Sequence, residues 1–348
     1  MKKSICMFFA LLLLVTSCAE VYRYTNDTFF AMNTVVNTVV SDEIGGDVWT
    51  ADILSDIESR MSRTLEDSEI SRLNRGEEVT LSDDTYTVLE KALQIARDTD
   101  YAFNPCMGTL TDLWDITSGK NIVPSDEEIK EALSLCDASL VTAENGKVTI
   151  PDGMKIDLGG VAKGYALYKA SENLSEEAMG KAVGADFCIS LGGNVSVSGS
   201  SKTRREAGQK GWNVGITNPF EKSETLGSIV LENACVSVSG AYERFFEKDG
   251  KIYHHIFDSK TGYPSDSGLA SAVVISRDGL LADALSTALF VMGLEKSEEF
   301  YRDGLYDFEA ILITADGDVF VTQELSEIFV INKNAKQINT DNVIIIEK

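Results

Sequence analysis

Residues 156–165 read Ile-Asp-Leu-Gly-Gly-Val-Ala-Lys-Gly-Tyr, an apolar run that changes into glycines and then into a helix-like pattern. We expect a strand over Lys155–Leu158, a glycine turn, and a helix over Tyr165–Leu174. Backbone N–H groups at such a turn, backed by a helix start, favour a phosphate, and Lys163 adds positive charge. The spacing matches neither GxGxxG nor GxxxxGK[ST]. A tight turn without a ligand would need the same glycines, so both interpretations stay open.

In the rest of the chain, the expected strands outnumber the expected helices and do not alternate regularly with them, which indicates an α+β fold. Apolar residues at helical spacing predict helices over Trp49–Ser62, Tyr86–Arg97 (capped by Ser82 or Asp83) and Leu280–Met292. Strands are expected over Thr34–Val40, Phe187–Leu191, Trp212–Ile216, Ala234–Val238, Ala270–Ile275, Ala310–Thr314 and Val319–Val321. A second strand-then-glycine unit at 189–193 repeats the one at 156–160, which hints at two related lobes that meet at a cleft.

The composition is that of a folded protein with an acidic surface. With 348 residues, 44% of them hydrophobic, the chain can form one large domain or two closely joined lobes. Its 55 acidic and 31 basic residues give a formal net charge of -24, which argues against nucleic-acid binding. An anionic small molecule would need a metal ion or local basic residues. Of the six cysteines, the four beyond Cys6 and Cys18 are scattered without a CxxC pair, which predicts buried free thiols; they are Cys106, Cys136, Cys188 and Cys235.

The N-terminus has the features of an export signal. Lys2 and Lys3 precede an apolar run over 5–15 that is too short to span a bilayer comfortably. Val15-Thr16-Ser17-Cys18 is similar to a bacterial lipobox, in which Cys18 would be lipidated. The alternative is an ordinary cleaved signal with an incidental cysteine. We therefore expect a lipid-anchored protein on the periplasmic side of the inner membrane. The expected boundaries are 1–17 for the signal peptide, 18–28 for a lipidated tether and 29–348 for the folded domain.

The expected helix Leu280–Met292 carries polar groups on one face. Asp283, Ser286 and Thr287 stand at positions i, i+3 and i+4, away from an apolar stripe at 281, 285 and 289. Carboxylate and hydroxyl oxygens suit Mg²⁺ that stays partly hydrated and is shared with substrate phosphates. Asp and Thr near a helix start are also capping groups, so this helix alone does not establish a metal site.

The only two histidines of the chain, His254 and His255, stand side by side and precede Ile-Phe-Asp-Ser-Lys-Thr-Gly-Tyr-Pro at 256–264. Adjacent residues of a strand point to opposite faces, so at most one is expected to enter a given site. A histidine can act as a general base or hold a phosphate near neutral pH. A surface histidine without a role is the alternative. Residues 234–246 fit a pocket wall for a flat, partly anionic ligand.

Together and in this order, these segments resemble the ApbE family of flavin transferases (FAD:protein FMN transferases). The similarity covers nearly the whole chain after the signal. The matching segments are Met32–Thr34, Met61–Asn74, Ala102–Pro105, Leu113–Trp114, Ile156–Tyr165, Ser190–Gly193, Trp212–Gly215, Ser239–Arg244, His255–Pro264 and Asp283–Gly293. The resemblance implies a T-fold-like α+β architecture: two lobes with mostly antiparallel sheets and packed helices around a central FAD cleft.

The resemblance also implies a site and a reaction. Mg²⁺ would be held by Asp283, Thr287 and the backbone carbonyl of Ala162, with His255 as catalytic base. Contacts to FAD are implied at Met32, Thr64, Ala102, Phe103, Asn104, Asp157, Lys163 and Phe257. The FAD pyrophosphate would be cleaved and FMN passed to a threonine hydroxyl of an acceptor protein, such as a subunit of an Rnf- or Nqr-type electron-transfer complex. With water in place of threonine, the products would be FMN and AMP.

Three positions depart from the family pattern. Asn33 stands where glycine is usual, Asn104 where aspartate is common, and Thr64 where many members carry an aromatic residue that stacks on the isoalloxazine. Stacking is worth roughly 1–3 kcal/mol in other planar-ligand sites, so we expect weak FAD retention, ready turnover and appreciable hydrolysis. The alternatives are a flavin-binding or delivery lipoprotein without chemistry, and a surface lipoprotein without a ligand.

Overall fold

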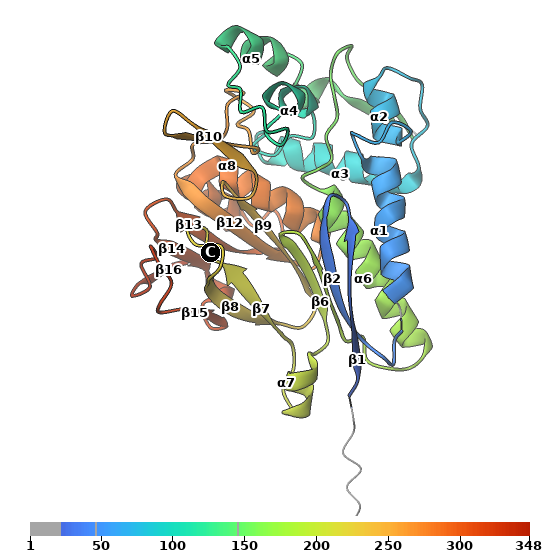
Figure 1. Ribbon diagram of the computed structural model, residues 1–348, viewed down its shortest axis with the longest axis vertical. Coiled ribbons are helices and arrows are strands. Elements are labelled where there is room, and N and C mark those ends of the chain that lie inside the picture. Colours follow the sequence, from blue (N-terminus) through green and yellow to red (C-terminus); the bar gives the residue numbers. More distant parts are fainter. Residues whose placement is uncertain (1–21, 46, 145) are drawn as a thin grey trace, which may run out of the picture.

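The computed structural model describes residues 22–348 except Gly46 and Asn145, and these form three layers with a cap at one end (Figure 1). The middle layer is a nine-stranded sheet of order β1-β2-β5-β6-β9-β12-β13-β14-β16. Adjacent strands of this sheet are antiparallel, except β14 and β16, which are parallel to each other. The predicted α+β class is confirmed. The strands are β1 (Tyr24–Ala31), β2 (Thr34–Ser41), β5 (Phe187–Leu191), β6 (Asn194–Ser198), β9 (Ala234–Gly240), β12 (Leu269–Ser276), β13 (Glu309–Thr314), β14 (Val319–Thr322) and β16 (Val343–Ile346).

The two faces of this sheet have different covers. Helix α8 (Gly279–Asp303) packs on β9 and β12, while α6 (Ala162–Gly180) packs on β5 and β6 and against α1 (Asp47–Met61). A three-stranded sheet covers the other face. Alternation along β12 separates the two cores, because Val274 packs with the helices and Val273 with the small sheet. The strands of the small sheet are β7 (Trp212–Thr217), β8 (Thr225–Leu231) and β15 (Phe329–Ile331).

Short helices and a hairpin form the cap, at the top of Figure 1. Part of the cap has a small core of its own around Trp114, Ile129 and Phe257, whereas Leu73 of α2 and Leu89 of α3 pack in the main helical core. The cap elements are α2 (Glu69–Asn74), α3 (Asp83–Asp98), α4 (Gly108–Trp114), α5 (Asp126–Leu133), β10 (Phe245–Lys248) and β11 (Lys251–His254). The remaining elements are β3 (Thr142–Glu144), β4 (Lys147–Thr149), α7 (Lys202–Glu206) and the 3-10 turns Ala138–Leu140 and Gln323–Leu325.

One predicted strand is wrong. Lys155–Leu158 forms no strand, because its backbone groups bind a side chain and a loop instead of a neighbouring strand. Ile156 exchanges two hydrogen bonds with the Asn74 side chain (2.7 and 2.8 Å), and Asp157 N donates to the Pro105 carbonyl (2.7 Å). The two strand-then-glycine units are therefore not equivalent. The second one is the β5–β6 hairpin, which turns at Gly192 with φ 61°.

The turn between β1 and β2 explains why Asn33 replaces a glycine. Ala31 pairs with Thr34, so Met32 and Asn33 form a two-residue loop, and both have positive φ (51° and 59°). A hairpin turn of this geometry needs φ above zero at both central residues, and asparagine tolerates that conformation better than most residues. Asn33 therefore fits the turn that the glycine would make.

The predicted signal peptide and Cys18 lie outside the described residues. Within the described part, β1 begins at Tyr24, so residues 24–28, which we expected in the tether, pair with β2. No helix among the described residues has both the length and the apolar character to cross a membrane. Cys106, Cys136 and Cys235 are buried free thiols, as predicted, and the free Cys188 is half-buried.

Candidate active site

Asp283 lies at the crossing of α6 and α8, where it is buried (5% exposed). Its Oδ2 accepts a hydrogen bond from the Gly164 amide (2.9 Å), and its Oδ1 accepts one from Ser237 on β9 (3.0 Å). The crossing is possible because Gly164 has no side chain: a Cβ there would lie 2.0 Å from the Gly279 carbonyl. Asp283 and Ser286, which were expected on a polar face of this helix, are therefore buried between α8 and the sheet.

The start of α6 brings Lys163 beside Asp283, and the glycine loop lies near Thr287. Lys163 Nζ lies 4.0 Å from Asp283 Oδ2 and donates to the Gly159 carbonyl (2.9 Å). Ala162, the first residue of α6, precedes Lys163, and Thr287 follows Asp283 by one helical turn. A Cβ on Gly160 would lie 3.8 Å from Thr287 Oγ1, so the loop reaches that hydroxyl.

The donor set at this place fits Mg²⁺. It offers the Asp283 carboxylate and the Thr287 hydroxyl, both hard oxygens one helical turn apart, and the Lys163 ammonium lies near the same carboxylate. No group of three His, Cys, Asp or Glu residues that could hold a metal occurs within the described residues. A cation here would therefore take further oxygens from water or from a phosphate ligand.

Asp157 holds the glycine turn in shape. Its Oδ1 accepts a hydrogen bond from Gly159 N (2.9 Å), and its Oδ2 accepts one from Thr111 (3.2 Å) and lies 3.5 Å from Arg63 Nε. The purely structural interpretation of this loop accounts for Asp157 and for three of its amides, because Gly159 N donates to Asp157 and the amides of Val161 and Ala162 donate to the Leu158 carbonyl (3.0 and 2.8 Å). It leaves Lys163 and Gly160 facing α8.

The two histidines have different environments. His254 is buried: its Nδ1 accepts from Ile256 N (3.3 Å), so Nε2 carries the proton and donates to the Ser265 carbonyl (3.0 Å). His255 is half-buried, and its Nδ1 lies 3.2 Å from the Arg244 carbonyl. A carbonyl can only accept, so Nδ1 holds the proton and Nε2 keeps a free lone pair. Desolvation by the surrounding protein, together with the charge of Arg244, lowers the pKa of His255 to about 3.

Most residues that were expected to contact the flavin lie in the cap, and Met32 lies in the turn between β1 and β2. Phe257 stacks on Trp114 (centroids 6.0 Å apart), and Phe103 is buried against Gly160, where an added Cβ would meet its ring at 3.2 Å. Asn104 does not project a free amide, because it accepts from Cys106 N and donates to the Cys136 carbonyl (both 2.8 Å). Ala102 and Met32 are half-buried.

Thr64 is exposed and lines a polar pocket of about 310 Å³. The sequence reasoning missed the cations of this pocket: Arg63, Arg75 and Lys155. The position of Arg63 directly before Thr64 was the available signal. Arg63 and Lys155 both pair with Asp112 (Lys155 at 2.6 Å), so only part of their charge is free for a ligand.

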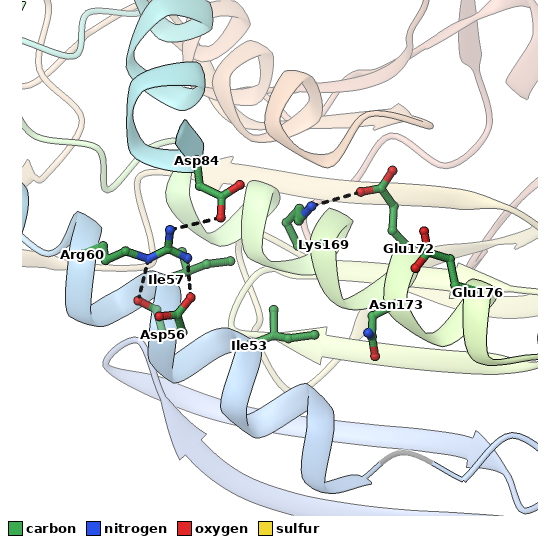
Figure 2. A pocket seen from close by; sticks show the side chains of 9 residues that line it. All are labelled: Ile53, Asp56, Ile57, Arg60, Asp84, Lys169, Glu172, Asn173 and Glu176. Atoms are coloured by element: carbon green, nitrogen blue, oxygen red, sulfur yellow. Dashed lines mark hydrogen bonds and ion pairs between the residues drawn. The ribbon is translucent and has the colours of Figure 1, made fainter. Parts of the chain in front are cut away.

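A second pocket, of about 250 Å³, lies between α1, the start of α3 and α6, and contains none of the predicted site residues (Figure 2). Figure 2 shows Arg60 bonded to Asp56 and Asp84, and Lys169 paired with Glu172 at 3.5 Å. Both cations of the pocket thus bind carboxylates of the protein, and because Asp56, Asp84, Glu172 and Glu176 outnumber them, the lining is acidic and disfavours an anionic ligand.

A glycine loop at a helix start, which lies against a buried carboxylate, a hydroxyl and the Phe103 ring, places the chain among α+β proteins with a candidate site where two helices cross. The chain belongs to the ApbE family, whose profile matches residues 32–312. It is 36% identical over 266 residues to the FAD:protein FMN transferase of Treponema pallidum (72% of each chain). The corresponding Klebsiella pneumoniae protein is 34% identical over 248 residues, covering 70% of this chain and 73% of the relative. The ApbE protein structure from Thermotoga maritima superposes with TM-score 0.78 at 31% identity, covering 88% of this chain and 99% of that one.

Proposed function

We propose that this protein is an FAD:protein FMN transferase that cleaves the FAD pyrophosphate and transfers FMN to a threonine hydroxyl. One observation carries the proposal: the α6 glycine loop and the Asp283–Thr287 turn of α8 meet through the Gly164–Asp283 hydrogen bond (2.9 Å). At this junction Lys163 would offer a positive charge to a phosphate, and Asp283 and Thr287 would offer oxygens to a metal ion. Relatives at 36% and 34% identity that bear this activity as their name support it.

The chain would hold the pyrophosphate between the glycine loop and α8. Lys163 offers a positive charge, and Asp283, Thr287 and the Ala162 carbonyl would hold Mg²⁺. When bound, Mg²⁺ would neutralise the charge that develops on the phosphate oxygens. Phe103 and Phe257 would pack on the flavin, with Met32, Thr64, Ala102, Asn104 and Asp157 completing the contacts.

His255 would act as the base. Its free Nε2 lone pair takes the proton of the attacking threonine hydroxyl while the threonine oxygen bonds to the FMN phosphorus. The bond between that phosphorus and the AMP oxygen breaks, and AMP leaves. With water in place of threonine, the same step yields FMN and AMP. The lowered pKa keeps His255 unprotonated at neutral pH, and a nearby anionic pyrophosphate raises its basicity.

Export and partners belong to the same proposal. The Lys2–Cys18 signal supports a protein lipidated at Cys18 and held on the periplasmic side of the inner membrane. The acceptors would then be exported or membrane proteins, with subunits of Rnf- or Nqr-type complexes as first candidates.

The test follows the nucleotide and the flavin separately. Purified protein is incubated with FAD, Mg²⁺ and a candidate acceptor; FMN and AMP are separated by chromatography, and covalent flavin is detected by in-gel fluorescence. We expect AMP release from the wild type, and its loss together with covalent flavin in Asp283→Ala. His255→Ala should reduce transfer at least as much as hydrolysis. FAD that stays bound and intact with wild-type protein would instead identify a binding or delivery protein. Normal turnover by Asp283→Ala would refute the metal assignment.

A further inference from the structure

A buried chain of hydroxyl groups lies beneath Asp283 and Thr287. Alternation along β9 places Ser237 and Ser239 on the face that α8 covers, where they meet Ser286 of α8. Ser237, Ser239, Ser286 and the adjoining Asn194 are all buried. Each serine hydroxyl has a single proton to donate, so the contacts restrict the direction of every bond.

One branch orients Thr287. Ser286 Oγ lies 2.9 Å from the backbone carbonyl of Asp283, which can only accept, so Ser286 donates there. Ser286 must then accept from Ser239 (2.9 Å), and Ser239, its proton used, must accept from Thr287 (3.2 Å). The Thr287 proton therefore points into the protein, and the lone pairs of its oxygen stay available on the side of the glycine loop.

The second branch orients the carboxylate. Ser237 donates to Asp283 Oδ1 (3.0 Å), so its 2.7 Å contact with the Asn194 amide requires Asn194 to be the donor. With the amide oxygen facing Ser237, Asn194 Nδ2 is buried without a partner among the described residues. A half-turn of the amide places Nδ2 against Ser237 and removes both conflicts, so Asn194 donates to Ser237.

We propose that Asn194, Ser237, Ser239 and Ser286 are positioning residues, which direct the lone pairs of Asp283 and Thr287 toward a divalent cation. The inference rests on the proposed function, because that function supplies the cation. Groups that hold metal ligands in one orientation typically change metal affinity by about 10- to 100-fold when they are removed. Serines that only satisfy one another in the core would affect stability and leave cation affinity unchanged.

The experiment measures cation affinity directly. Mn²⁺ is titrated in the cold into full-length protein with FAD, and free Mn²⁺ is followed by electron paramagnetic resonance. Ser239→Ala should raise the apparent Kd for Mn²⁺ by roughly 10-fold or more, and Ser239→Thr, which keeps the hydroxyl, should restore it. Asn194→Asp keeps the size of the side chain but offers only acceptors, so it should draw the Ser237 proton from Asp283 and weaken Mn²⁺ binding as well.

The matched control is Ser297→Ala. Ser297 is buried ten positions after Thr287, beyond the break in α8 at Gly293 (φ 78°), and donates a hydrogen bond to the Leu289 carbonyl (3.0 Å), outside the chain of serines. Its Kd for Mn²⁺ should equal that of the wild type. Ser286→Ala is the second variant, used if Ser239→Ala does not fold. It removes the hydroxyl between Asp283 and Ser239, and alanine is a strong helix former. If Ser239→Ala, Ser286→Ala and Ser297→Ala all bind Mn²⁺ with the same Kd, and the wild type still releases AMP, the positioning role is overturned and the proposed function stands. Absence of AMP release from the wild type would refute the proposed function itself.

Discussion

The Gly164 amide donates a hydrogen bond to Asp283 Oδ2 at 2.9 Å, across 119 positions of the sequence. The bond forms because α6 and α8 touch backbone to backbone at Gly164 and Gly279. This contact presses the first turn of α6, with Ala162 and Lys163, against the start of α8. The phosphate-binding and metal-binding halves of the proposed site therefore depend on one helix crossing.

Gly164→Ala should damage both stability and activity. Its methyl group would meet the Gly279 carbonyl at 2.0 Å, and overpacking of this kind costs about 1–3 kcal/mol of unfolding free energy. Urea unfolding and AMP release measure the two effects. Gly180→Ala, at the other end of α6 with no atom within 4 Å, is the control and should stabilise by about 0.5–1 kcal/mol. If Gly164→Ala had the same unfolding free energy as the wild type, the close backbone contact between α6 and α8 would be contradicted.

His255 should make the protein less stable in mild acid. Its folded-state pKa, about 3, lies below its ordinary value of 6.5, so the neutral side chain is fully compatible with the fold above pH 6.5. Stability is then lost as the pH falls from 6.5 toward 3, by at most about 1.4 kcal/mol per pH unit for one proton. His255→Gln should show a shallower loss in urea unfolding between neutral and mildly acidic pH. Parallel curves for the two proteins would show that His255 titrates normally.

Asn33 should be replaceable by glycine but not by a β-branched residue. Because φ is 59° there, Asn33→Gly should leave stability and FAD affinity nearly unchanged. Asn33→Val should cost roughly 1–2 kcal/mol, the penalty of a left-handed conformation for an ordinary residue. Thermal unfolding and FAD titration of both variants check this. A marked gain in FAD affinity in Asn33→Gly would mean that the departure from the family pattern weakens binding after all.

Thr64 should govern how long FAD stays bound. An aromatic side chain at this exposed position, as in Thr64→Tyr, should strengthen FAD binding by roughly 1–3 kcal/mol, and so slow its loss on dialysis with Mg²⁺. Thr64→Val, which adds no ring, should behave as the wild type does. If wild-type protein already retains FAD through dialysis, the hypothesis of weak retention and ready hydrolysis is wrong.

Much of the local structure could be predicted from residue patterns. The apolar spacing of α1, α3 and α8 and the β-branched run of β2 indicate those elements directly, and Ser82 caps α3 as expected by accepting from Thr85 N. Short elements such as α2, α4 and β10 were not predicted, because so few residues carry little periodicity. Lys155–Leu158 has the composition of a strand, yet it finds a side chain and a loop as partners in place of a strand.

The candidate site also has one part that could be predicted from the sequence and one part that could not. The sequence alone determined which residue types are available and which of them share a helical turn, as Asp283 and Thr287 do, because such relationships depend only on local backbone geometry. The tertiary structure alone decided that the Gly164 amide, Ser237 and Ser239 surround this turn, and that the Arg244 carbonyl selects the tautomer of His255. These contacts join segments far apart in the chain. They follow from strand order and from a glycine-permitted helix crossing, which no local pattern records.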